Sequence, residues 1–353
     1  MVLSEWAAFF TQKNLTERQS SDLILFSICH SIITGFRVRM SYQEVAIRNV
    51  MYILGIALKE VYNDCEAEDQ MMKRSKFFSS ALIFNCVISA FMYTVEAVLR
   101  SVRAGETFNT IITAWPDVED RSVLSNVGRA MFYIIWWIYI SRVFAVYTLV
   151  ICLTIAVSHQ FKTLNSYFYN LNNIFDDENQ LTQREKEEEY ERALKVGIKI
   201  FVLLLSIFYI ITADIQSIIS WITICRDVFS GQIIFNLLLL IVLMYQMVNS
   251  PRNLTNVLTL VVSALTILLS TGFFMWNAGD ITVEAENLPT AMFFSGWENC
   301  GRGSSVRVRK LIVIAMMQAQ LPVVLSGLGI IALSYQSYVS IVKSSYSVFS
   351  VLY

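Results

Sequence analysis

The sequence predicts an all-α protein whose helices cross a membrane several times as one bundle. Of its 353 residues, 55% are hydrophobic and 16% are charged, against about 25% charged in ordinary soluble domains. The apolar runs are long and lack the alternation of barrel strands. Lipid offers the backbone no hydrogen-bond partner, so these runs must form helices. We therefore expect residues 1–353 to form a single transmembrane helical bundle domain.

Composition also argues against several other classes of function. A net charge of −1 does not favour a nucleic-acid partner. The six cysteines form no CxxC pair and there are only two histidines, so we expect neither a metal site nor a cofactor. We recognise no Gly-rich phosphate loop, no paired carboxylates and no Ser/His/Asp set. The sequence therefore predicts a protein that is not an enzyme.

The spans are predicted from length and hydrophobicity, since a bilayer requires roughly 20 apolar residues. The first candidate, Leu23–Phe36, is short, although Arg37 at its end can extend to the membrane surface. Another weak candidate, Ile200–Ala213, stops at Asp214. The convincing spans are Phe77–Leu99, Met131–Val157, Gln232–Val248, Leu254–Trp276 and Leu311–Val342.

The last span is expected to be interrupted. Pro322, followed by Gly327 and Gly329, can break it into two pieces. The chain then ends in SYQSYVSIVKSSYSVFSVLY, in which aromatic rings and hydroxyls share one helical face at i, i+3, i+4 and i+7. The residues of this stripe are Tyr346, Phe349, Ser350 and Tyr353.

Basic residues in the loops predict the orientation. Residues 37–76 contain seven Lys or Arg residues, and Arg302, Arg307, Arg309 and Lys310 precede the last span. Both segments are therefore expected on the cytoplasmic side, with the C-terminus outside. Residues 158–195 and 277–310 are predicted to be cytoplasmic connections, and residues 311–353 the broken last helix.

Several stretches resemble insect odorant receptors, in the same order along the chain. Near the start is SEWAAFFTQKNLTERQSSDLI, and the ending Tyr346-Ser-Val-Phe-Ser-Val-Leu closes the series. The stretches between them are Trp115-Pro-Asp, Ser158-His-Gln-Phe-Lys-Thr-Leu, Asp214-Ile-Gln-Ser-Ile-Ile, Thr290-Ala-Met-Phe-Phe-Ser-Gly-Trp297 and Gln318-Ala-Gln-Leu-Pro322.

This resemblance implies a seven-transmembrane bundle with inverted topology, the N-terminus inside and the C-terminus outside. It implies an odorant-specific subunit of a ligand-gated, non-selective cation channel that acts in olfactory sensory transduction. The partners would be a small volatile hydrophobic odorant, membrane lipid and a common co-receptor in a heterotetramer. The channel would lie in the plasma membrane of olfactory sensory neurons. The stripe of Tyr346, Phe349, Ser350 and Tyr353 would then line the pore as its gate.

An odorant pocket is expected to be a small apolar cavity with few polar groups. Candidate walls come from the aromatic parts of two spans: Phe91, Met92, Tyr93, Phe132, Tyr133, Trp136 and Trp137. Arg142 lies within an apolar span, where a charge is costly, so we expect it to pair with a carboxylate such as Glu96. We expect His30 to serve in helix packing.

Two regions depart from the family pattern. The sequence begins near the end of the family's first span, so we expect that span to be incomplete here. Lys195–Thr212 has no counterpart, and we hypothesise that it is translated intron; the alternative is a genuine extra membrane segment. Two alternatives for function also remain: a gustatory receptor of the same superfamily and a G-protein-coupled receptor.

Overall fold

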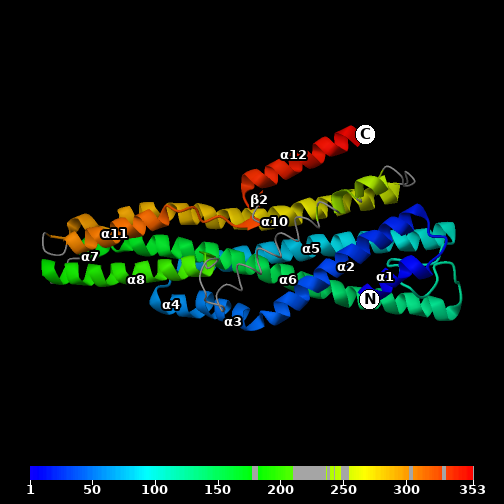
Figure 1. Cartoon of the computed structure of the whole chain (residues 1–353), viewed down its shortest axis with the longest axis horizontal. Helices are drawn as coiled ribbons and strands as arrows, with labels where there is room; N and C mark the ends of the chain where they lie inside the picture. The colour runs from blue at the N-terminus through cyan, green and yellow to red at the C-terminus, as the bar shows by residue number, and fades with distance from the viewer. Residues whose placement is uncertain are drawn as a thin grey trace.

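The structure, a computed structural model, describes residues 1–176, 182–209, 254–301, 305–327 and 331–352, together with residues 236, 239–241 and 243–247. The described residues are nearly all helical, and the long helices run along the long axis of the molecule (Figure 1). The longer helices are α1 (Val2–Thr11), α2 (Glu17–Tyr42), α5 (Cys65–Ala104), α6 (Val123–Asn170), α8 (Gln183–Tyr209), α10 (Leu254–Phe293), α11 (Ser305–Ala319) and α12 (Tyr335–Leu352).

Shorter elements connect these helices. A short bend is built from α3 (Glu44–Tyr52), a π-helical turn (Ile53–Ala57) and α4 (Leu58–Val61). The single turn α7 (Asn173–Asp176) precedes α8, and a 3₁₀ turn (Trp297–Asn299) follows α10.

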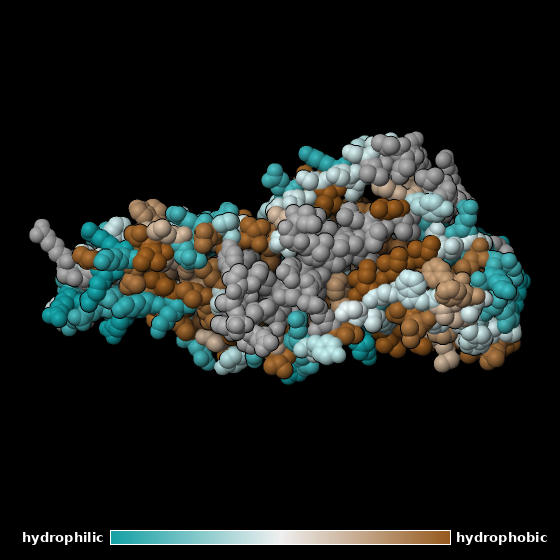
Figure 2. Space-filling model, viewed as in Figure 1, coloured by the Kyte–Doolittle hydropathy of each residue, from teal (hydrophilic) through white to brown (hydrophobic). Residues whose placement is uncertain are grey.

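Four helices are long and apolar enough to cross a membrane, within the part of the chain that the structure describes. They are Glu17–Tyr42, Cys65–Arg103, Val123–Phe175 and Val257–Asn299. These helices contain the predicted spans 23–36, 77–99 and 131–157 and all but the first residues of 254–276. The predicted spans 200–213 and 232–248 lie partly outside the described residues. In Figure 2, apolar surface covers much of the half of the molecule that holds α2, and hydrophilic side chains gather toward the two ends.

Local polar groups determine where helix α5 begins. The Asp64 carboxylate accepts hydrogen bonds from the backbone N–H groups of Glu66 and Ala67, both at 3.1 Å. These bonds satisfy donors that a helix leaves unpaired in its first turn. The bond from Ala67 is the main cause that lowers the pKa of the Asp64 carboxyl below its usual value.

The last predicted span is not one helix. Helix α11 ends at Ala319, three residues before Pro322, because proline cannot continue the hydrogen-bond ladder. Two short strands follow, β1 (Ser326–Gly327) and β2 (Ile331–Ala332), which pair antiparallel with Ser326 opposite Ala332. Helix α12 then starts at Tyr335 and diverges from α10 (Figure 1). The helix is therefore interrupted near Pro322, within the predicted span 311–342.

The main core lies where α6, α8, α10 and α11 pack together. Its largest fully buried side chains include Tyr190 and Phe201 of α8 and Phe161 and Phe168 of α6. Residues 195–209, the described part of the segment that lacks a family counterpart, continue α8 without a break. Residues 210–212 lie outside the described residues. Helix α10 likewise continues through the predicted connection as far as Phe293.

Candidate functional site

Helix α2 forms one wall of the candidate site, and its start is firmly capped. The Thr16 hydroxyl accepts a hydrogen bond from the Gln19 backbone N–H at 3.3 Å, and Gln19 Oε1 accepts one from the Thr16 N–H at 3.0 Å. This reciprocal pair satisfies two backbone N–H groups at the helix start. Further along, Phe26, His30 and Ile33 follow at i, i+4 and i+7, which places them on one face of α2.

An elongated cavity of about 200 Å³ lies between α2, α5, α6 and α10. Its wall on α6 extends over residues 136–147, about 16 Å of helix at 1.5 Å per residue. Equal lengths of α5 and α10, residues 82–93 and 263–274, form the facing walls. The volume lies below the roughly 300–1,000 Å³ of sites for drug-sized molecules, so the cavity suits a smaller ligand.

The cavity wall is mostly apolar, and many of its hydroxyl groups already have partners. On α10, three wall hydroxyls donate to carbonyl oxygens three or four residues earlier in the helix, at 2.8 or 2.9 Å. They belong to Ser263, Thr266 and Ser270. A bound molecule would therefore gain free energy chiefly from burial, at about 25 cal/mol per Å² of apolar area.

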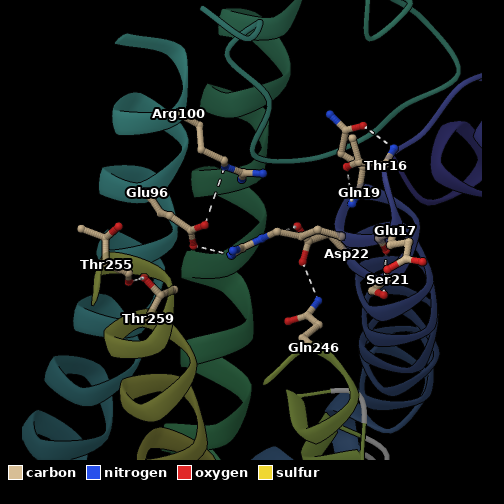
Figure 3. Close-up of polar contacts among 11 residues, drawn as sticks. Thr16, Glu17, Gln19, Ser21, Asp22, Glu96, Arg100, Gln246, Thr255 and Thr259 are labelled. Carbon is tan, nitrogen blue, oxygen red and sulfur yellow. Dashed lines mark hydrogen bonds and ion pairs between the residues drawn. The ribbon is translucent and has the colours of Figure 1, made fainter. Parts of the chain in front are cut away.

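Beyond one end of the cavity lies a largely buried ionic network, formed by Arg18, Asp22, Glu96 and Arg100. Figure 3 labels Asp22, Glu96 and Arg100 of this network. Arg18 pairs with Glu96, and its Nε lies 3.8 Å from Asp22 Oδ2. Arg100 Nε lies 3.7 Å from Glu96 Oε1. Gln246 Nε2 also donates to Asp22 Oδ1 at 2.9 Å. Two cations thus balance two carboxylates at a site where an isolated charge would be costly.

The position of the network follows from helical spacing. Glu96 lies three residues beyond Tyr93 on α5, and Asp22 lies four residues before Phe26 on α2. Tyr93 and Phe26 both line the cavity, so the network lies one helical turn beyond its wall. The network joins α2, α5 and the segment 243–247 by polar contacts.

Two of the seven pocket residues chosen from the sequence, Tyr93 and Trp136, line this cavity. Phe91 does not; it is 57% exposed and belongs to a stripe with Phe77 and Phe84 on the outside of α5. A side chain seven residues along a helix returns to nearly the same face. Phe91 therefore lies on the outer face although its neighbours in sequence are close to the cavity.

The other four candidates are not among the described residues that line the cavity: Met92, Phe132, Tyr133 and Trp137. The rings of Tyr133 and Trp137 instead contact Trp136, with centroids 6.1 Å and 5.7 Å from it. These two rings therefore pack against a wall residue without lining the cavity. The cavity lining also includes Cys29 and His30 of α2, which were not among the predicted pocket residues. The feature of the sequence that indicates this wall is the spacing of Phe26, His30 and Ile33, which places them on one face of α2.

The expected pairing of Arg142 with Glu96 is wrong. Glu96 binds Arg18 and Arg100 in the ionic network. Arg142 is exposed on α6, on the same face as Met131 and Ile138, which are 58% and 55% exposed. Spacings of seven and four residues keep these three side chains on the outside of the bundle, away from the buried carboxylate.

Helix α12 contains three of the four residues predicted to line a pore. Tyr346 is 72% exposed, and Ser350 is also exposed. Phe349 belongs to the same helix, while Tyr353 lies outside the described residues. A different face of α12, which includes Ser337, Ile341 and Ser344, borders a hollow of about 740 Å³. Leu240, Ile241 and Met244 line its other side.

Comparisons with known proteins agree with this architecture. The structure matches the insect olfactory receptor OR5 from Machilis hrabei with a TM-score of 0.72 at 14% sequence identity, covering 99% of this chain and 87% of that one. The same receptor in complex with eugenol matches with a TM-score of 0.65, at the same identity and coverage. No curated protein sequence matches the chain.

A family model assigns the chain to its group. The model, described as 7tm Odorant receptor, matches residues 25–346, which is most of the sequence. The matched region includes every residue that lines the cavity. The family is one of receptors and not of enzymes, and its members are multi-pass membrane proteins. With this match, the apolar bundle and the likeness in fold, the chain belongs to the 7tm odorant receptor family.

Proposed function

We propose that this chain is the odorant-binding subunit of a ligand-gated, non-selective cation channel. It assembles with a common co-receptor as a heterotetramer in the plasma membrane of olfactory sensory neurons. The observation that carries the proposal is the mostly apolar cavity between α2, α5, α6 and α10. A small volatile hydrophobic molecule gains free energy in such a cavity from burial and from contact with its aromatic rings.

The arrangement of the last segment supports a role in ion conduction. Helix α12 is separated from α11 by the β1–β2 pair, and its side chain Tyr346 is exposed. Four such helices around an axis would bring rings and hydroxyls together in a constriction that excludes water when closed. The basic residues in 37–76 and 307–310 favour a cytoplasmic position for both segments and an outward C-terminus.

Co-expression in oocytes with the co-receptor tests this function. Odorants from a broad panel should evoke inward currents that need both subunits and that persist when G-protein signalling is blocked. Oocytes with the co-receptor alone control for its own responses. Currents that require a G protein and no co-receptor would contradict the channel proposal.

A further inference from the structure

His30 is held at the cavity wall by a buried carboxylate. Its Nδ1 lies 2.7 Å and 2.9 Å from the two carboxylate oxygens of Glu5 on α1. Glu5 is 0% exposed and His30 only 3%. The imidazole is stacked on Phe26 and meets Tyr139 edge to face, with centroids 5.6 Å and 5.0 Å away. The orientation of the ring is therefore fixed on three sides.

The second ring nitrogen of His30 has no protein partner in the described part of the chain. Nδ1 is directed at Glu5, so Nε2 is the hydrogen-bonding atom that the ring has left for the cavity it lines. Among the described residues, Trp136 Nε1 and Tyr147 Oη also lack partners, but both atoms are buried. The Tyr139 hydroxyl donates to the His30 carbonyl oxygen at 2.8 Å.

Electrostatics determines whether Nε2 of His30 carries a proton. A net charge inside an apolar bundle is far more costly than a balanced pair. The Glu5–His30 pair has two states of zero net charge: a carboxylate with an imidazolium, and a carboxylic acid that donates to Nδ1. In both states the remaining proton of the ring is on Nε2. The cavity is therefore lined by an unpaired N–H donor.

We propose that His30 Nε2–H recognises a hydrogen-bond-accepting oxygen of the odorant, as in a ketone, aldehyde or ester with a slim apolar body. The proposal rests on the function proposed above. A hydrocarbon of the same shape would leave the buried donor unpaired. The length of the wall on α6, about 16 Å, favours an elongated molecule over a bulky one.

The test compares ligands that differ only in the acceptor. One pair is acetophenone and α-methylstyrene, in which a methylidene group replaces the carbonyl oxygen; methyl alkyl ketones and their methylidene counterparts extend the series. Currents from the full chain with its co-receptor should favour the ketone by at least about tenfold in half-maximal concentration. His30→Phe keeps a ring but removes the N–H, so the ketone should lose about tenfold while the alkene changes less than about threefold.

His159→Phe is the matched control. His159 is the other histidine of the chain, and its Nδ1 lies 2.9 Å from the Ile155 carbonyl oxygen, away from the cavity. This variant should retain the full preference for the ketone. It also leaves His30 as the single histidine, so isotope-labelled histidine in the purified full chain gives an NMR signal for Nε2–H that should shift with acetophenone. That measurement remains available if His30→Phe fails to fold.

The outcomes separate this inference from the proposed function. Odorant currents with equal potency of ketone and alkene would overturn the role of His30 and leave the channel intact. A shifted Nε2–H signal without any current would support the recognition and contradict the channel. A signal unchanged by every ketone of the series, or equal losses for both ligands in His30→Phe, would overturn the inference.

Discussion

At the scale of residues, the charges of the buried ionic network balance one another. Arg18, with a side chain that is 10% exposed, sits between the carboxylates of Asp22 and Glu96. Removing one member of such a group leaves its partners buried and uncompensated, which costs more than the pairing itself contributes. An ion pair at the surface differs, because water solvates each charge when the other is absent.

Replacing Arg18 by methionine should therefore destabilise the protein by about 3 kcal/mol, toward the lower end for breaking a buried pair. The thermal unfolding of the purified chain in detergent measures the change. Arg48→Met is the control, since Arg48 and its partner Glu44 are 75% and 60% exposed. It should cost less than about 1 kcal/mol. Equal effects of the two substitutions would mean that burial of the network does not matter to stability.

At the scale of elements, close approach of helices depends on small residues. Gly197 of α8 faces α6, and a Cβ atom there would lie 2.8 Å from a ring carbon of Tyr167 and 2.9 Å from one of Phe168. Phe168 is fully buried, and the Tyr167 hydroxyl donates to the Ala193 carbonyl oxygen at 2.8 Å. Neither ring can move aside cheaply, so this glycine permits the contact between the two helices.

Gly197→Ala should lower the stability by about 1–2 kcal/mol, because overpacking exceeds the gain in helix propensity. Gly35→Ala on α2, where no atom lies within 4 Å of the added Cβ, should instead stabilise by about 0.5–1 kcal/mol. Thermal unfolding of both variants checks the signs. A stabilising Gly197→Ala would mean that residues 195–209 do not pack against α6 as the structure has them.

At the scale of the whole molecule, α12 is the helix that would line the pore of the proposed channel. Its exposed Tyr346 and the apolar end that follows would meet their counterparts in other subunits around the pore. An apolar constriction blocks ions because water leaves it when it is narrow. A polar side chain at this constriction should keep water in it, so that ions can pass.

Phe349→Ser should therefore raise the resting current of the assembled channel several-fold, measured in oocytes without odorant. Phe349→Leu keeps the position apolar and should leave the resting current near its original value. Surface labelling of both variants controls for the amount delivered to the membrane. Unchanged gating and ion selectivity in Phe349→Ser would mean that Phe349 serves in helix packing and not in the gate.

Hydropathy and helix breakers were sufficient to predict the helical class, three of the spans and the interruption near Pro322, because each depends on a short stretch of chain. The motifs from Trp115-Pro-Asp to the C-terminal Tyr346-Ser-Val-Phe-Ser-Val-Leu predicted the family for the same reason. The site was predicted less well. Phe91, Trp136 and Trp137 are equally aromatic in sequence, yet of these only Trp136 lines the cavity.

The tertiary structure decided which faces meet and which charges pair. Glu5 and His30 lie on different helices, as do Arg18 and Glu96. Such contacts depend on the rotation and offset of one helix against another, which no single stretch of sequence specifies. A local pattern thus predicts that a helix forms and which side is apolar. Only packing decides whether an apolar side faces lipid, another helix or a ligand.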